Sequence, residues 1–182
     1  MKVQEIIDFL ETDIISLSKG SQGLKLFSLR EGMGDESVAL DDLAKENSQN
    51  PFWTLLFREI VNFLREGKHR MPLDLSAFTP FQQEVFRALG DVEPGSILTY
   101  KELATSLGRP GGAQAVGNAI AKNPVSFFLP THRILPQKGI GICRTGAGYL
   151  RERLLEKEGH DLSKLRGNYL CPRKKCCNLP DN

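Results

Sequence analysis

The chain has 182 residues, of which 40% are hydrophobic and 25% are charged, proportions typical of a soluble globular protein. It contains no apolar run of the roughly 18 residues that a membrane span needs, and its N-terminus lacks a signal-peptide pattern. We therefore expect a cytosolic protein, nuclear if the cell has a nucleus, with no membrane partner.

The net charge of +2 is too small to indicate nucleic-acid binding by itself. An acidic segment at Asp35–Glu46 and a more basic C-terminal half permit a basic face, but fit a solvated surface equally well.

The N-terminal part predicts a hairpin and a long helix. Alternating apolar residues flank the glycine-containing turn Lys19–Gly23, which indicates two antiparallel strands. Pro51–Glu66 carries its apolar residues on one helical face and is followed by Gly67, where we expect the helix to end. The proline-containing stretch Lys68–Thr79 reads as a linker. We place the domain boundary there, between residues 75 and 76.

From Thr79 onward the pattern becomes helical. Thr79-Pro80 predicts an N-cap and a first helical residue. Thr99 caps a helix over Tyr100–Leu107, with Glu102 completing a capping box, and another helix follows over Ala113–Lys122. The glycine-containing turn between these two helices gives the outline of a helix-turn-helix. By itself this pattern is weak evidence for DNA binding, because the second helix lacks the several Arg, Asn and Gln residues that read base edges. Contact with DNA would depend on the shape of the duplex, on backbone amides and on phosphates.

The next segment places polar residues directly behind an apolar run. Val125–Leu129 is apolar and ends at Pro130, and Thr131, His132 and Arg133 follow at once. Folds deliver side chains to a pocket in this way, but a strand end with a His and an Arg on the surface gives the same pattern. On this segment alone we favour the surface interpretation.

Pro130-Thr131-His132-Arg133-Ile134 resembles the Pro-Cys-His-Arg-Val signature of the O6-alkylguanine-DNA alkyltransferases, which flip an alkylated guanine from the duplex and transfer its alkyl group irreversibly to that cysteine. Other blocks match the family with ungapped spacing: Thr79-Pro80-Phe81-Gln82, Pro94-Gly95, Thr99-Tyr100, Leu103-Ala104, Ala115-Val116-Gly117, Asn123-Pro124, Leu154-Leu155 and Glu158-Gly159. The resemblance is close over Ser76–Leu162. It implies an α/β (α+β) fold, with a small ribonuclease H-like sheet domain at residues 1–75 and a mainly helical winged helix-turn-helix DNA-binding domain at 76–165.

The resemblance also implies roles for individual residues. His132 would act as a general base through a water, Glu158 would orient it, and Asn123 would hold the hinge between the recognition helix and the site. Tyr100 would contact the phosphate beside the flipped base, and the small residues of Ala113–Ala121 would enter the minor groove. The residues expected to contact DNA are Tyr100, Gln114, Ala115, Gly117, Arg133 and Arg144.

Three departures from the family pattern bear on function. Thr131 occupies the nucleophile position, and an alcohol is far less acidic and less nucleophilic than a thiol, so transfer to Thr131 is not expected. Gln114 stands where the family has an arginine finger that fills the space of the flipped base; it can hydrogen bond but brings no charge, so weaker DNA binding is expected. Arg144-Thr145 replaces a pocket-lining Tyr-Ser pair.

The cysteines indicate reduced thiols rather than a disulfide framework. They are Cys143, Cys171, Cys176 and Cys177, and the last three crowd into the tail. The tail supplies no second CxxC pair and no His at ligand spacing, so a disordered basic tail over residues 166–182 is favoured over a metal site. We expect neither a metal nor a cofactor.

Three functions follow from these observations. We expect foremost a monomer that binds double-stranded DNA carrying alkylated guanine without repairing it, as alkyltransferase-like members of this superfamily do, and that flags the lesion for nucleotide excision repair proteins. An active methyltransferase with another acceptor, such as Cys143, is one alternative. A decayed homologue that no longer binds DNA is the other.

Overall fold

The computed structural model describes residues 3–10, 14–28, 36–40, 42, 51–125, 127–139 and 148–165. The chain forms two compact units, Met1–Pro94 with Ala119–Pro130, and Gly95–Asn118 with Thr131–Asn182. These units divide the chain elsewhere than at residue 76, and the domain boundary expected there stays a prediction. Every helix in the described ranges is too short or too polar to cross a lipid bilayer.

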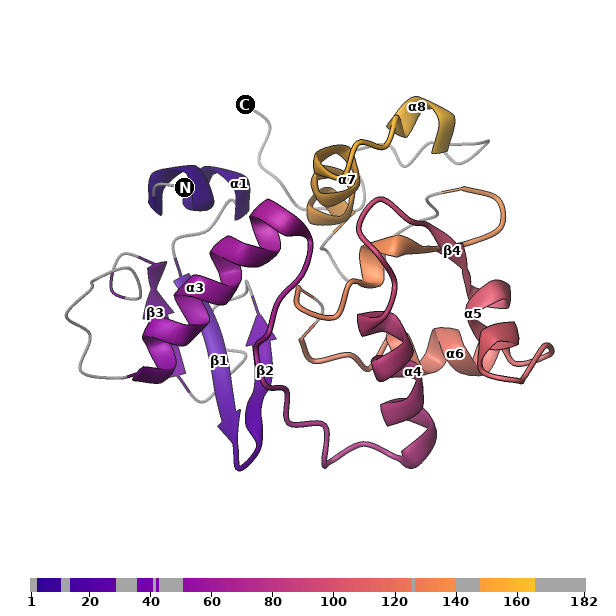
Figure 1. The fold of residues 1–182 in the computed structure, drawn as a ribbon, viewed down its shortest axis with the longest axis horizontal. Helices are drawn as coiled ribbons and strands as arrows, with labels where there is room; N and C mark the ends of the chain where they lie inside the picture. The colour runs from indigo at the N-terminus through magenta and orange to yellow at the C-terminus, as the bar shows by residue number, and fades with distance from the viewer. Residues whose placement is uncertain are drawn as a thin grey trace. The chain divides into compact units, whose positions relative to one another are not determined.

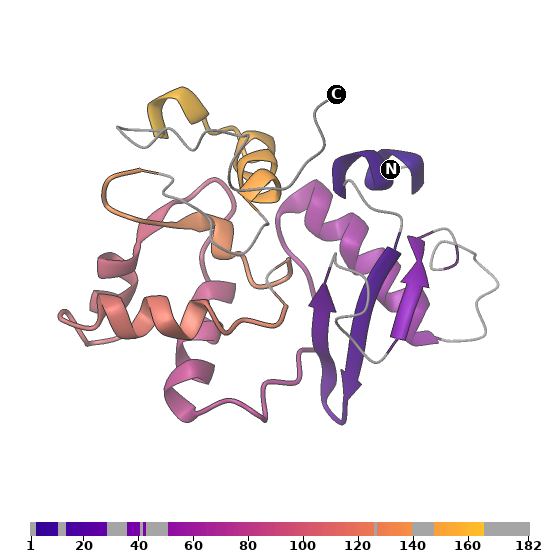
Figure 2. The ribbon, with the colours of Figure 1, turned by 180° about the vertical axis from the view of Figure 1, so that it is seen from behind.

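The first unit is built on a three-stranded antiparallel sheet. Its strands β1 (Ile14–Gly20), β2 (Gly23–Ser28) and β3 (Glu36–Ala39) lie in the order β2-β1-β3. Helix α3 (Pro51–Glu66) runs across one face of the sheet, in front of it in Figure 1 and behind it in Figure 2. The predicted hairpin and the predicted bounds of α3 are confirmed. A short helix, α1 (Val3–Leu10), precedes the sheet.

The hairpin is anchored at its turn by the segment that follows α3. The Leu24 amide donates to the Pro72 carbonyl at 2.8 Å, and the Asp74 amide donates to the Leu24 carbonyl at 2.8 Å. Gly23 adopts a φ of 144°, and a Cβ there would lie 2.3 Å from the Pro72 carbonyl oxygen. Only glycine fits this approach of two backbones. The stretch expected to be a linker is therefore tied to the sheet.

Aromatic side chains form the core beneath α3. Phe63 of α3 lies 4.7 Å from Phe127, and Phe27 of β2 lies 5.1 Å from Phe128, between ring centroids. The Phe27 amide also donates to the Pro124 carbonyl at 3.0 Å. Val125, Phe127, Phe128 and Leu129 are buried, and these described residues of the run form turns rather than a strand, because aromatic packing and the bond to β2 hold them.

Helix α4 (Pro80–Gly90) begins where the sequence predicts. The Thr79 hydroxyl accepts from the Gln82 amide, and the Gln82 side chain accepts from the Thr79 amide, which forms a capping box. Proline follows the cap, where a missing N–H costs nothing. Val85, Phe86 and Leu89 form the buried face of the helix.

The second unit contains short elements joined by turns. They are β4 (Leu98–Thr99), α5 (Tyr100–Ser106), η1 (Thr131–Arg133), β5 (Ile134–Leu135), α7 (Gly148–Lys157) and α8 (Leu162–Leu165). Helix α6 (Ala113–Ile120) spans the division between the units. β4 and β5 pair in parallel, with Leu98 opposite Ile134. The predicted capping box of Thr99 and Glu102 is confirmed.

Helix α5 ends in a turn that separates it from α6. Gly108 has a φ of 69°, the Gly108 amide donates to the Thr105 carbonyl at 2.9 Å, and the Arg109 amide donates to the Ala104 carbonyl at 2.9 Å. This is the hydrogen-bond pattern of a Schellman motif. The two predicted helices and the glycine-containing turn between them are therefore present.

Gly23→Ala should destabilise the protein by more than about 2 kcal/mol, because the added methyl group meets the Pro72 carbonyl oxygen, which cannot move without breaking its hydrogen bond from the Leu24 amide. Gly90→Ala is the matched control, since nothing lies within 4 Å of a Cβ at that position. It should change the free energy of unfolding by less than about 1 kcal/mol. Urea unfolding of the three proteins measures both; equal effects of the two substitutions would contradict this account of the hairpin.

Candidate functional site

His132 and Arg133 lie on the single turn η1 and are buried, with 2% and 1% of their surface exposed. Both side chains point to Glu158. His132 Nε2 lies 2.9 Å from Glu158 Oε1, and the Arg133 guanidinium donates to the same carboxylate through Nε at 3.0 Å and Nη2 at 2.6 Å. The surface interpretation of the Thr-His-Arg triplet is therefore wrong. The three side chains form a buried ionic cluster.

The backbone brings Glu158 to this cluster by ending α7 in a second Schellman motif. Gly159 has a φ of 89°, its amide donates to the Glu156 carbonyl at 3.0 Å, and the His160 amide donates to the Leu155 carbonyl at 3.0 Å. A helix followed by glycine is a stop signal readable from sequence. It fixes Glu158 at the C-cap, with its side chain turned toward η1.

The parallel pairing of β4 with β5 supplies one further donor. Parallel strands begin at the same edge of a sheet, so the residues before β4 meet the residues before β5. The Gly95 amide accordingly donates to Glu158 Oε2 at 3.2 Å. From the sequence, Gly95 was noted only within the Pro94-Gly95 block and was given no role at the site. Its contact with the carboxylate depends on strand pairing, for which two-residue strands give no sequence signal.

The charges in this cluster are set by burial and by these hydrogen bonds. Burial raises the pKa of Glu158, but the hydrogen bonds from His132 and Arg133 outweigh it and hold that pKa at about 2. Burial lowers the pKa of His132 and outweighs the raising effect of the hydrogen bond to Glu158. At neutral pH the cluster therefore contains a carboxylate, a guanidinium and a neutral imidazole that can accept a proton.

The Arg133 guanidinium is enclosed in the cluster. Its side chain is buried and bidentate on Glu158, whereas a phosphate-binding arginine needs an exposed guanidinium. The DNA contact expected for Arg133 stays a prediction, and the burial of its guanidinium against Glu158 does not favour it. The residue holds the carboxylate that orients His132.

Thr131 and Asn123 lie at either side of the run that ends at Pro130. Thr131 is half-buried at the start of η1, next to His132 in the chain. Asn123 belongs to the other compact unit, where its Oδ1 accepts from the Val125 amide at 2.9 Å and its Nδ2 donates to the Leu129 carbonyl at 3.5 Å. Its side chain thus joins the two ends of the 123–129 loop. The hinge role expected for Asn123 stays a prediction.

The helix-turn-helix places the remaining expected residues on α5 and α6. Tyr100 lies against Gly117, where a Cβ would be 3.7 Å from the tyrosine ring. Gln114 and Ala115 are exposed on α6. Gln114 also donates to Asn118 at 3.1 Å, a contact that the sequence reading missed although the two residues have the i, i+4 spacing of helix neighbours.

Arg144, Thr145 and Cys143 lie outside the described residues, as does the tail over residues 166–182. Among the residues that the structure does describe, no three His, Cys, Asp or Glu side chains gather as a metal site.

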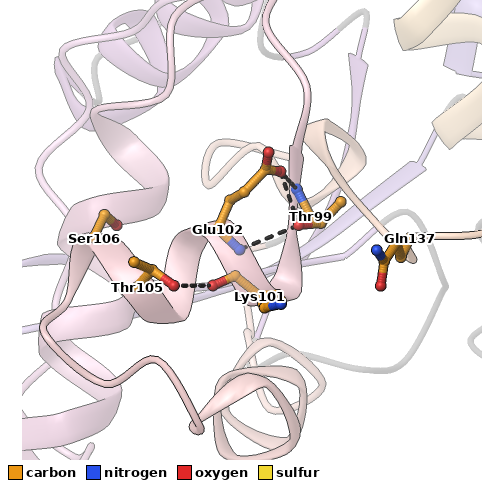
Figure 3. A pocket seen from close by; sticks show the side chains of 6 residues that line it. All are labelled: Thr99, Lys101, Glu102, Thr105, Ser106 and Gln137. Atoms are coloured by element: carbon orange, nitrogen blue, oxygen red, sulfur yellow. Dashed lines mark hydrogen bonds between the residues drawn. The ribbon is translucent and has the colours of Figure 1, made fainter.

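A shallow hollow of about 620 Å³ lies beside α5 (Figure 3). Its lining residues are Thr99, Lys101, Glu102, Thr105, Ser106 and Gln137. Thr99 and Glu102 hydrogen bond to one another, and the Thr105 hydroxyl donates to the Lys101 carbonyl at 2.9 Å (Figure 3). These groups stabilise the helix, and the hollow contains no member of the buried cluster. We assign the candidate reaction centre to η1 and Glu158.

Glu158→Gln should lower the free energy of unfolding at pH 7 by about 3 kcal/mol, because it leaves Arg133 buried without its counter-charge. Since the pKa of Glu158 is depressed from 4.5 to about 2 in the folded chain, its contribution is complete above pH 4.5 and is lost as the pH falls toward 2. The difference between the two proteins should therefore shrink over that range.

A separate loss caused by His132 begins near pH 6.5, where the unfolded chain takes up a proton that the buried imidazole resists. It occurs in both proteins and is larger in Glu158→Gln, because that variant lacks the carboxylate that raises the pKa of His132. Exposed Glu156 on α7 offers the control Glu156→Gln, which should follow the parent at every pH. Chemical unfolding at several pH values measures all three. A pH-independent difference between Glu158→Gln and the parent would contradict the charge assignment.

Comparison with known proteins identifies the sequence region that contains this cluster. The family description "6-O-methylguanine DNA methyltransferase, DNA binding domain" matches residues 80–160. The methylated-DNA–protein-cysteine methyltransferase of Salmonella typhimurium is 43% identical over 82 residues, 45% of this chain and 48% of that protein. The chain thus spans about half the length of this relative.

Two further proteins match a larger share of the chain. The crystal structure of Mycobacterium tuberculosis OGT in complex with DNA has a TM-score of 0.58 at 27% identity, covering 79% of this chain and 85% of that one. This likeness confirms the mixed α/β fold expected from the resemblance. The methylated-DNA–protein-cysteine methyltransferase of Saccharolobus islandicus is 35% identical over 121 residues, 65% of this chain and 78% of that protein. The chain therefore belongs to the family of the methylated-DNA–protein-cysteine methyltransferases, the O6-alkylguanine-DNA alkyltransferases.

Proposed function

We propose that this protein binds duplex DNA at an O6-alkylguanine, turns the alkylated base out of the helix and retains it beside Thr131 without removing the alkyl group. The bound lesion would then pass to nucleotide excision repair proteins. The observation that carries the proposal is a threonine at the nucleophile position, directly before an otherwise complete buried cluster of His132, Arg133 and Glu158.

The chemistry of the side chain argues against transfer at Thr131. The relatives are named for methylation of a protein cysteine. A thiol has a pKa near 8.5, within reach of a neutral imidazole, and its thiolate attacks a saturated carbon well. A threonine hydroxyl is far less acidic, and its branched Cβ hinders attack. The neutral His132 can accept a proton, but it cannot generate an alkoxide at neutral pH.

The geometry of α5 and α6 supports DNA as the partner. The exposed surface of α6 is formed mainly by Gln114, Ala115 and Asn118, whose small or neutral side chains let a helix approach a groove closely. Tyr100 lies beside Gly117 at the end of α5 that faces α6. The family description that matches this region is that of a DNA-binding domain, and the Mycobacterium tuberculosis relative was crystallised with DNA. We propose that Gln114 occupies the space of the flipped base.

Base flipping costs a few kcal/mol and costs least for a poorly paired base, which alkylated guanine is. A protein that binds the flipped base without chemistry should therefore prefer lesion-containing DNA, and it should release that DNA unchanged. Such a protein recognises damage without being consumed by it.

A DNA-binding titration followed by a mass measurement distinguishes lesion binding from methyl transfer. The protein should bind a duplex with one O6-methylguanine at least about ten-fold more tightly than the same duplex with guanine, because the modified pair is cheaper to open. Fluorescence anisotropy at a fixed, stated salt concentration measures the ratio. After prolonged incubation, the intact mass of the protein should be unchanged. Equal affinities would contradict lesion recognition, and a methyl increment would contradict retention without transfer.

Thr131→Cys should restore transfer of one methyl group per chain, since His132 remains beside the new thiol and Glu158 remains bonded to His132. Thr131→Ser is the matched control, because it keeps a hydroxyl while removing the methyl group, and it should remain unmethylated. Intact mass and peptide mapping after incubation with O6-methylguanine DNA measure both. A folded Thr131→Cys protein that binds the lesion yet stays unmethylated would show that the cluster no longer supports catalysis.

A further inference from the structure

The exposed side of α6 carries a neutral polar pair. Gln114 and Asn118 are the only residues of this helix whose side chains form hydrogen bonds, and the rest are Ala, Val, Ile and Gly. Both are exposed and lie one helical turn apart. Gln114 Nε2 donates to Asn118 Oδ1 at 3.1 Å. The two amides therefore form one hydrogen-bonded group.

The orientation of α6 turns this pair away from the interior. Val116, Ala119 and Ile120 have 0%, 2% and 8% of their surface exposed. Residues at i and i+4 share a helical face, so Gln114 and Asn118 lie together on the side that these buried residues leave open. The Gln114 amide is therefore presented outward on a helix whose other face is fixed in the core.

We infer that Asn118 is a positioning residue for Gln114, and that the pair reads the hydrogen-bonding groups of the base left unpaired opposite the flipped guanine. The inference rests on the proposed function, because it requires α6 to enter the duplex. A glutamine amide has two N–H donors and a carbonyl acceptor. Asn118 takes one N–H, which leaves Gln114 with one donor next to one acceptor in a fixed order.

Both pyrimidines that face O6-alkylguanine match this order. Cytosine presents its N4 donor beside the N3 acceptor, and thymine presents its N3 donor beside the O2 acceptor. The donor and acceptor of the Gln114 amide can therefore bond N3 and N4 of cytosine, or, after a shift of one position along the base edge, O2 and N3 of thymine. An arginine offers donors alone, so it cannot accept a hydrogen bond from either base. The pair in this chain should therefore tolerate cytosine and thymine alike.

Asn118 contributes by ordering Gln114 before DNA arrives. A free glutamine loses side-chain freedom when it binds, and that loss weakens affinity. The hydrogen bond to Asn118 already restricts the Gln114 amide in the unbound protein, so less side-chain entropy is lost when DNA binds. The contribution should be modest, since a single exposed i, i+4 contact on a helix is weak.

The test compares three duplexes with O6-methylguanine placed opposite cytosine, thymine or difluorotoluene, a thymine analogue without strong hydrogen-bonding groups. The proteins are the parent, Gln114→Ala, Asn118→Ala and the double variant. The parent should bind the cytosine and thymine duplexes within about two-fold of each other and the difluorotoluene duplex more weakly. Asn118→Ala should weaken binding to the two natural pairs by about three-fold and leave the difluorotoluene duplex unaffected.

In the Gln114→Ala background, adding Asn118→Ala should change no affinity, because the residue acts through Gln114. The thermal midpoint of Asn118→Ala should equal or exceed that of the parent, since alanine favours helix. If the parent prefers the lesion and Asn118→Ala binds every duplex as tightly as the parent does, the inference is overturned and the proposed function stands. A uniform loss on all three duplexes would also overturn it. A parent that fails to prefer the lesion would overturn both.

Discussion

The carboxylate of Glu158 is the point on which the second compact unit depends. It is hydrogen bonded to His132 and Arg133 of η1 and to the Gly95 amide, so it joins two segments that are far apart in the chain. A buried charge is costly unless it is paired and hydrogen bonded, and these contacts meet both conditions. The same carboxylate neutralises Arg133 and hydrogen bonds His132, while burial keeps the imidazole of the candidate base neutral.

The substitution at position 131 leaves this cluster intact. Thr131 stands next to His132 in the chain but supplies none of the hydrogen bonds described for Glu158, so a change of its side chain removes a nucleophile without disturbing the neighbouring charges. The buried charges therefore do not depend on which side chain stands at position 131. Under the proposed function, Gln114 contacts the DNA bases, and its hydrogen bond to Asn118 links the two side chains.

Contacts within the first unit restrain residues 123–130, the segment that precedes Thr131. Phe27 and Phe63 pack against Phe127 and Phe128, and the amide of Phe27 bonds the Pro124 carbonyl. Asn123 closes the same loop through its side chain. A segment of turns has few backbone hydrogen bonds of its own, so aromatic packing and one asparagine supply the restraint that a strand would obtain from a ladder.

Local chemistry allowed much of this fold to be predicted from sequence. The Thr79 and Thr99 caps, the bounds of α3 and the glycine turns follow from interactions between residues a few positions apart, and the Pro-Thr-His-Arg motif identified the family. The surface position first favoured for His132 and Arg133 was wrong, and Gly95 was missed, because their contacts join residues 25 to 63 positions apart. Burial of a polar residue is a property of what packs around it, and no local pattern encodes that. The sequence by itself determined the helices, the turns and the missing thiol. Only the tertiary structure decided that Arg133 pairs with Glu158, since a guanidinium binds whichever carboxylate the fold brings to it.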